Sequence, residues 1–159
     1  MLDKNEQARL KKEKEKQDYI RRERLNELLL IHPESRRVSE ETELTELLVD
    51  FPCFQAVAED DFDMLVQLTR EIYMECLLPD TVILNQDDEP DNCYVIMQGE
   101  CKVFVTFKYK KFNKIKTKTK HMCDVGNRTC FGELSLLFNG KRTATVQTME
   151  VCYVIIIPR

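Results

Sequence analysis

The side chains best suited to chemistry lie in one segment, Phe131 to Val146. Gly132 allows an anion to approach backbone amides near a helix start, where the helix dipole favours negative charge. Arg142 carries a permanent planar guanidinium that matches the geometry of phosphate oxygens. Glu133 accepts hydrogen bonds when ionised, so beside an arginine it can take a sugar hydroxyl. These residue types in this order predict a site for a sugar phosphate.

Other kinds of chemistry find less support. His121, Cys123 and Cys130 lack a fourth ligand at zinc spacing, so we expect no metal site. The chain has no nucleophile motif, Walker loop or metalloprotease signature, and we expect no enzymatic activity. The cysteines form an odd set without a CxxC pair, which predicts reduced, buried thiols in a cytoplasmic protein: Cys53, Cys76, Cys93, Cys101, Cys123, Cys130 and Cys152.

A candidate modification site precedes this region. Arg36-Arg37-Val38-Ser39 is similar to the Arg-Arg-x-Ser sites of basophilic kinases, so Ser39 is a candidate for phosphorylation. The alternative is that Ser39 caps a helix, because Glu40 and Glu41 after it suit the positive end of the helix dipole.

Helices are expected at the start of the chain. Strong helix formers without Gly or Pro predict one long helix from Asp3 to about Ile31, ended by His32-Pro33. Residues 11–18 include no apolar side chain, so only the last turns can bury a face. We expect a short helix from Ser39 to Val49, a break at Phe51-Pro52-Cys53-Phe54, and a helix over Glu59 to Thr69 with Phe62, Leu65, Val66 and Leu68 on one side.

From Glu71 the apolar pattern changes to a period of two, which is typical of strands. Short strands separated by turn-forming residues predict a sandwich, barrel or jelly roll after the helices. The expected strands are Ile72 to Cys76, Thr81 to Leu84, Cys93 to Met97, Lys102 to Phe107, Ile115 to Met122, Thr145 to Thr148 and Cys152 to Ile157.

The net charge of -4 is a sum over blocks of opposite sign. Lys4 to Arg24 mixes both signs, Glu59 to Asp91 is acidic, and Lys102 to Lys120 contains eight lysines and no carboxylate. This segregation argues against bulk nucleic-acid binding. We interpret the lysine-rich stretch as a solvated hairpin. The alternatives are docking of its basic face on an acidic membrane or a tubulin-like surface, and nucleic-acid stacking through the interleaved Phe104, Phe107, Tyr109 and Phe112.

The 159 residues fit one ordinary domain with a polar tail. No apolar run approaches the roughly 18 residues of a membrane span. The first residues are charged, so we expect no signal peptide.

The segment Phe131 to Val146 resembles the phosphate-binding cassette of the cyclic-nucleotide-binding domain family, with Gly-Glu, a small residue at Ser135 and Arg-Thr-Ala-Thr-Val in place. Asp91 to Glu100 is similar to that family's third strand, turn and fourth strand, and Leu47 to Leu68 resembles its first helices. The resemblance implies a mainly β fold with flanking α, an eight-stranded jelly-roll-like barrel (a double-stranded β-helix) preceded by N-terminal helices.

The resemblance also implies the role of each site residue. Glu133 would bind the ribose 2′-hydroxyl and Arg142 the exocyclic phosphate oxygens, while backbone amides would complete the cradle near Gly132, Leu134 and Ala144. In the family, a threonine at the position of Thr143 accompanies cGMP preference; the alternative is that Thr143 only suits a strand start. The ligand, cAMP or cGMP, therefore stays open, and no other cofactor is implied.

Two departures from the family pattern stand out. The loop before the third strand has Asp87-Asp88-Glu89-Pro90 where family members usually have glycines, so we expect an altered, more acidic path. The family continues into helices that cap the base, whereas this sequence ends at Arg159, so we expect the lid to come from elsewhere or from a longer protein.

These observations predict a charged helical extension over residues 1–38 and a cyclic-nucleotide-binding domain over residues 39–159 without its C-terminal helices. We expect a non-enzymatic sensor of cAMP or cGMP, with a protein partner on residues 3–31. The alternative is a scaffold or cytoskeletal module that docks through the charged helix and the lysine-rich hairpin, with cytoskeletal or ciliary association and ligand binding secondary or lost.

Overall fold

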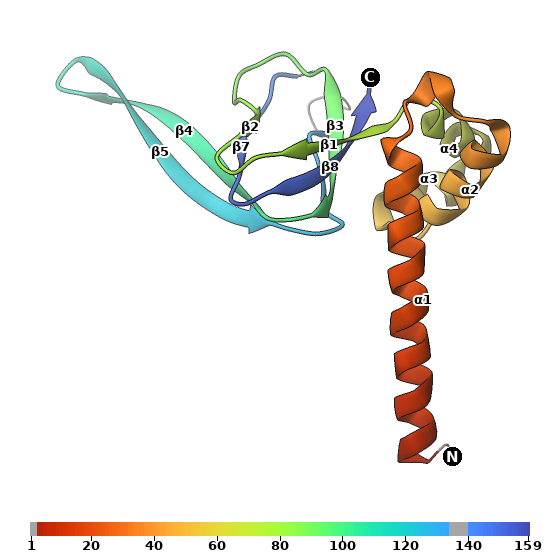
Figure 1. The fold of residues 1–159 in the computed structure, drawn as a ribbon. Helices are drawn as coiled ribbons and strands as arrows, with labels where there is room; N and C mark the ends of the chain where they lie inside the picture. Colours follow the sequence, from red (N-terminus) through yellow and green to blue (C-terminus); the bar gives the residue numbers. More distant parts are fainter. Residues whose placement is uncertain (1–2, 134–139) are drawn as a thin grey trace. The chain divides into compact units, whose positions relative to one another are not determined.

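A computed structural model describes residues 3–133 and 140–159 of the chain, which divides into two compact units, Met1–Arg70 and Glu71–Arg159. Among the described residues, no helix combines the length and the apolar character needed to cross a bilayer. The first unit is helical and contains α1 (Lys4–Leu30), the 3-10 helix η1 (Pro33–Ser35), α2 (Val38–Leu48), α3 (Pro52–Asp60) and α4 (Phe62–Thr69) (Figure 1).

The long helix α1 confirms the expected one. It begins with a capping box in which the Asp3 carboxylate accepts from the amides of Asn5 and Glu6, and it is exposed through residue 23. Its last turns bury Leu25, Leu28 and Leu29, so the helix packs only at its C-terminal end.

The start of α2 differs from the expected one. Ser39 was a predicted N-cap, but α2 begins at Val38, and Ser39 lies exposed in its first turn. The Glu40 carboxylate accepts from the Arg37 amide at 2.8 Å and from Arg37 Nη2 at 2.7 Å. Because Glu40 satisfies this amide and pairs with the guanidinium, the helix begins without a serine cap.

The prediction for the next two helices was also partly wrong. The expected break is present over residues 49–51, but Pro52 lies beyond it and occupies the first turn of α3, where its missing amide is not needed. The single expected helix over Glu59 to Thr69 is divided by Asp61, whose side chain accepts from the Met64 amide at 3.1 Å and caps α4. Leu65 is buried in α4 as expected, whereas Phe62 is exposed.

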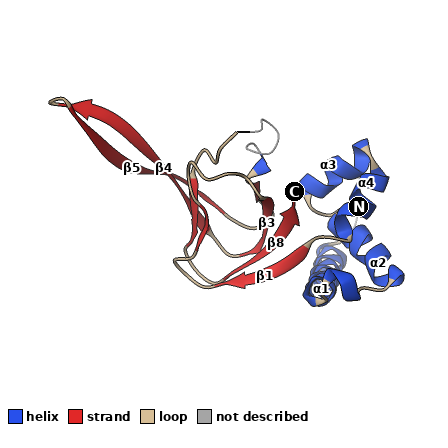
Figure 2. Cartoon of the chain, turned by 90° about the horizontal axis from the view of Figure 1, so that it is seen from above, coloured by secondary structure: helices blue, strands red, loops and turns tan. Residues whose placement is uncertain are grey.

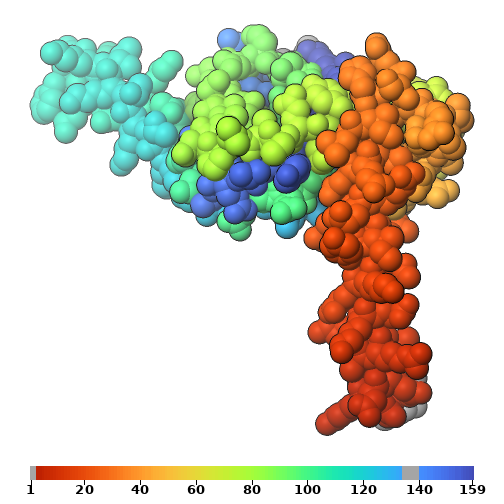
Figure 3. Space-filling view, viewed as in Figure 1, coloured from red at the N-terminus to blue at the C-terminus, as the bar shows by residue number. Residues whose placement is uncertain are grey.

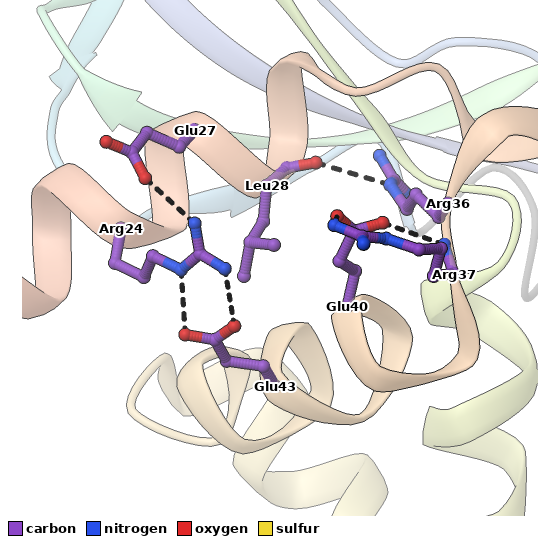
Figure 4. A network of polar contacts seen from close by, with 7 residues as sticks. All are labelled: Arg24, Glu27, Leu28, Arg36, Arg37, Glu40 and Glu43. Carbon is purple, nitrogen blue, oxygen red and sulfur yellow. Dashed lines mark hydrogen bonds and ion pairs between the residues drawn. The ribbon is translucent and has the colours of Figure 1, made fainter.

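Two arginines connect the helices of this unit (Figure 4). Arg24 of α1 forms a two-pronged pair with Glu43 of α2, with N···O distances of 2.8 and 2.7 Å. Arg36 is buried and donates to the backbone carbonyls of Leu28 at 3.3 Å and Thr69 at 2.8 Å. Arg36 thus satisfies carbonyls at the C-terminal ends of both α1 and α4, where free carbonyls carry partial negative charge.

The second unit is a β-sandwich of two antiparallel four-stranded sheets in its described part, ordered β1-β8-β3-β6 and β2-β7-β4-β5 (Figures 1 and 2). Its strands are β1 (Tyr73–Leu77), β2 (Val82–Leu84), β3 (Asn92–Gln98), β4 (Cys101–Lys111), β5 (Lys114–Val125), β6 (Cys130–Phe131), β7 (Thr145–Thr148) and β8 (Cys152–Pro158). The seven expected strands are present, β7 with the expected bounds and the others with shifted ends, and β6 was missed because two residues show no periodicity.

The inner faces of the sheets form one apolar core that includes Ile96, Val146 and Val154. This arrangement confirms the expected fold class, a jelly-roll-like β-sandwich with N-terminal helices.

The cysteine prediction holds only in part, because Cys76 and Cys123 are exposed. Cys101 and Cys152 are buried in the core with their Sγ atoms 3.9 Å apart. Burial raises the pKa of the Cys101 thiol to about 12, so it packs there as a neutral apolar group.

Candidate functional site

Strand pairing brings three distant segments together at one end of the sandwich. Antiparallel β3 and β6 pair Tyr94 with Phe131, so the start of β3 lies beside the residue that follows β6, Gly132. Arg142 comes shortly before β7 and returns the chain to the same place through its hydrogen bonds. The start of β3, the end of β6 and Arg142 therefore define the candidate site.

Arg142 is the centre of this site and is only 2% exposed. Its Nη1 donates to the Gly132 carbonyl at 2.7 Å, and its Nη2 donates to the Asn92 carbonyl at 2.6 Å. Nη2 also bonds Asp91 Oδ1 at 3.0 Å. A buried guanidinium needs such acceptors, and two fixed carbonyls hold its plane in one orientation.

A glycine is required at position 132 both by its positive φ and by the close approach of Arg142. Its φ is +89°, in a region that side chains other than hydrogen rarely allow. A Cβ added there would lie 2.9 Å from Arg142 Nη1, 3.4 Å from the Asn92 carbonyl oxygen and 3.5 Å from Tyr94 Cδ2. The glycine thus lets the guanidinium approach the backbone closely enough to bond its carbonyl.

An aromatic pair supports the arginine from one side. Tyr94 and Phe131 stack with ring centroids 5.3 Å apart and an interplanar angle of 15°. Arg142 Cζ lies 5.9 Å from the centroid of the Tyr94 ring, within the range of a cation–π contact. Burial raises the pKa of Tyr94, so the ring stays neutral beside the cation.

The acidic loop Asp87 to Asp91 holds the backbone of the arginine as well. The Asp87 amide donates to the Arg142 carbonyl at 2.8 Å, and the Arg142 amide donates to the Asp88 carbonyl at 2.9 Å. Asp87 adopts a positive φ of 71°, which aspartate tolerates better than most residues. Lys141 Nζ lies 3.5 Å from Glu89 Oε1 in a further, exposed pair. The loop that departs from the family pattern is therefore joined to the residues around Arg142 by main-chain and side-chain bonds.

The Arg142 guanidinium can exchange the Asp91 carboxylate for another acceptor while its own position stays fixed. The Gly132 and Asn92 carbonyls belong to the backbone and stay in place, whereas the Asp91 side chain is 70% exposed. An anion with suitably placed oxygens can therefore displace the Asp91 carboxylate without dismantling the pocket that orients Arg142.

Among the predicted site residues, the structure brings Gly132 and Arg142 into direct contact. Glu133 follows Gly132 and is half-buried, and it makes no hydrogen bond or ion pair with another described residue. Thr143 is exposed and Ala144 is half-buried. Leu134 lies outside the described residues, as does Ser135.

The candidate phosphorylation site lies in the helical unit. The Ser39 side chain is exposed, but Arg36 of the same motif is buried and bonded to two backbone carbonyls. A kinase that reads both arginines would have to release Arg36 from this position.

Sequence reasoning missed the contacts of Asp91, Asn92 and Tyr94 with the arginine. Asp91 and Arg142 are 51 positions apart, so no local spacing connects them. An available signal was charge, because the acidic loop Asp87 to Asp91 is complementary to the arginine of the predicted site.

Comparisons with known proteins agree on one family. The family model described as "Cyclic nucleotide-binding domain" matches residues 74–159. Among curated proteins, the cAMP-dependent protein kinase type II regulatory subunit of Drosophila melanogaster is 32% identical over 85 residues. That match covers 54% of this chain and 19% of the fly protein, so the chain spans only about a fifth of this relative's length.

Solved structures show the same fold. The regulatory domain of Toxoplasma gondii PKA with cAMP aligns with a TM-score of 0.56 at 20% identity, covering 77% of this chain and 43% of that one. The regulatory subunit of a cAMP-independent protein kinase A from Trypanosoma cruzi, bound to guanosine, aligns with a TM-score of 0.59 at 19% identity, covering 74% and 39%. At these identities the likeness concerns the fold and leaves the ligand open.

Proposed function

Because this chain belongs to the cyclic nucleotide-binding domain family, we propose that it binds cAMP or cGMP through Arg142 as a non-enzymatic regulatory module. The observation that carries this proposal is the buried guanidinium of Arg142, oriented by the carbonyls of Gly132 and Asn92. A cation fixed before the ligand arrives loses little freedom on binding, which favours affinity.

The exocyclic oxygens of the cyclic phosphate would take the place of the Asp91 carboxylate on Arg142. The phosphate would gain a charged hydrogen bond from a buried donor, whereas Asp91 would move into solvent, where its side chain is already largely exposed. Glu133, the residue after Gly132, would accept a ribose hydroxyl, as the resemblance to the family implies. Backbone amides near Gly132, Leu134 and Ala144 would complete the phosphate cradle.

The regulatory role follows from differential binding. A nucleotide that binds one arrangement of the Asp91 loop better than another shifts the population toward that arrangement. The acidic loop is bonded to residues 141 and 142. Displacement of Asp91 would therefore be transmitted through the loop to the backbone of Arg142. The relatives named as kinase regulatory subunits support a place for this module within a larger regulatory protein.

The choice of nucleotide would depend on Thr143. Its side chain is exposed in the structure, so a hydroxyl is free to meet the base of a bound ligand. We propose a modest preference for cGMP, tested by competition of cAMP and cGMP for a fluorescent analogue. A clear preference for cAMP would discard this assignment.

Isothermal titration of the full chain with each nucleotide tests the binding proposal. Arg142→Lys keeps the positive charge but loses the planar fork, and Arg22→Lys makes the same change on the exposed part of α1. A charged hydrogen bond contributes roughly 1.5 to 3 kcal/mol, so Arg142→Lys should weaken binding about tenfold to a hundredfold. Equal affinities of the two variants would refute the proposal. It would also be refuted if the unsubstituted chain gave no binding heat with either nucleotide at millimolar concentration.

A second candidate function is supported by α1. Residues 3–23 are exposed within their unit, so this polar stretch of α1 packs no face there and is accessible to a partner. We propose that a protein partner, such as a cytoskeletal polymer, binds residues 3–31. Co-sedimentation with microtubules and actin filaments, lost on deletion of residues 3–23 and unaffected by nucleotide, would support this function, and no sedimentation with either polymer would oppose it.

A further inference from the structure

The β4–β5 hairpin is much longer than the sheet that supports it. β7 pairs with β4 only over Cys101 to Phe104, whereas β4 and β5 continue to pair as far as Lys111 and Lys114. The distal part is therefore a two-stranded ribbon that extends beyond the sandwich (Figure 2) and forms a separate lobe of its surface (Figure 3). We call residues 107–118 the hairpin tip.

The turn at the hairpin tip is unusual in its sequence. Phe112 and Asn113 have φ values of 52° and 54°, so both central residues of the two-residue turn are left-handed. Asparagine suits such a turn, but a bulky aromatic residue is a rare and strained choice. Phe112 is also 87% exposed; the Lys111 ammonium lies 5.8 Å from its ring centroid, but too little of the side chain is buried among the described residues to offset the strain. A position that breaks local rules without a folding benefit points to a role in contact with something else.

A second apolar side chain accompanies Phe112. Ile115 is 74% exposed and lies opposite Lys110, one pair from the turn. The apex therefore presents two large apolar side chains to the surroundings.

Lysines surround this apex on both faces of the ribbon. Directly opposite residues of an antiparallel pair share a face, and faces alternate along each strand. One face carries Phe107, Tyr109, Lys111, Lys114, Lys116 and Lys118; the other carries Lys108, Lys110, Ile115 and Thr117. Lys111 lies directly opposite Lys114, a like-charged pair that disfavours the hairpin. The sequence has no carboxylate from residue 101 to residue 123, so no side chain of the hairpin tip neutralises this charge.

We propose that the hairpin tip docks end-on to a lipid bilayer that contains anionic phospholipids. Phe112 and Ile115 would enter the interfacial region, where apolar and aromatic side chains are favourably placed. The lysines on both faces would meet the anionic headgroups around them, each contributing electrostatic attraction. A nucleic acid lying along the ribbon would use one face only, and it would leave the apolar apex in water.

Co-sedimentation of the full chain with lipid vesicles tests this proposal. Binding is expected to vesicles of phosphatidylcholine mixed with phosphatidylserine, not to phosphatidylcholine alone, and it should weaken as salt screens the charges. The double substitution Lys114→Gln and Lys116→Gln should lower binding about 30-fold, at roughly fivefold for each lysine. The control Lys12→Gln and Lys14→Gln removes the same charge from the exposed part of α1 and should leave binding unchanged.

The substitution Phe112→Asn distinguishes an effect on vesicle binding from an effect on folding. Asparagine suits a left-handed turn, so the melting temperature should hold or rise while vesicle binding falls about tenfold. Vesicle binding that survives Phe112→Asn, or that falls equally in the α1 control, would overturn the proposal. The absence of vesicle binding together with binding to a single-stranded RNA would overturn it as well and assign the lysines to nucleic acid.

Discussion

The substitution Gly132→Ala probes the geometry that holds Arg142. The added Cβ would lie 2.9 Å from Nη1, closer than real Cβ atoms approach, at a φ of +89°. The end of an arginine side chain can usually move away from an added Cβ. The Arg142 side chain is 2% exposed and its guanidinium bonds two backbone carbonyls, so it cannot move without losing these bonds.

Two costs follow. A side chain in the left-handed region destabilises the fold by roughly 1 to 2 kcal/mol. Displacement of the guanidinium from the Gly132 carbonyl forfeits a charged hydrogen bond of about 1.5 to 3 kcal/mol. We therefore expect a loss of about 2 to 5 kcal/mol in the free energy of unfolding and at least tenfold weaker binding of cyclic nucleotide.

Gly126→Ala provides the matched control. Its Cβ would meet other atoms only at 3.8 Å, an ordinary van der Waals distance. Urea unfolding followed by circular dichroism gives the stability, and calorimetric titration gives the affinity. If the alanine variants of Gly132 and Gly126 match in both measurements, the close approach of Gly132 to Arg142 has no energetic role and the reasoning is refuted.

Three further predictions concern other contacts. Asp91→Asn should tighten nucleotide binding about twofold to fivefold, because it weakens a competing pair whose carboxylate is exposed and is therefore worth about 0.5 to 1 kcal/mol; calorimetry with unchanged or weaker binding would contradict displacement. Arg36→Met should lower the free energy of unfolding by about 1 to 3 kcal/mol, since it removes the donor to the buried Thr69 carbonyl and one of two donors to the Leu28 carbonyl, which keeps the Ile31 amide; urea unfolding checks this. Hydrogen bonds from Arg37 hold the pKa of Glu40 below its ordinary value of 4.5, so its contribution is present above about pH 4.5 and is lost as the pH falls through the lowered pKa. Thermal melts across that range should show a weaker acid dependence for Glu40→Gln, and identical curves would count against this pair.

The fold was predictable because its signals are local. The helical composition up to Ile31 and the period of two after Glu71 both correspond to observed elements. The errors occurred where a local preference was overridden. Ser39 is a good capping residue, but the bond between Glu40 and the Arg37 amide starts the helix earlier.

The site was predictable only in its contiguous part. Gly132 and Arg142 lie in one short segment, so their types and order indicated a phosphate site. Asp91 and Tyr94 reach the same arginine through the pairing of β3 with β6, and β6 has two residues and no sequence signature. The helix cap at Asp61 was missed for a different reason, because an amphipathic pattern continued across it.

The central claim is that the phosphate of a cyclic nucleotide binds Arg142 in place of Asp91, and NMR of the side chains tests it most directly. On addition of cAMP or cGMP, the guanidinium nitrogen signals of Arg142 should shift while the carboxyl carbon of Asp91 moves toward its value in free solvent. A nucleotide that binds, yet leaves both signals unchanged, would contradict the claim.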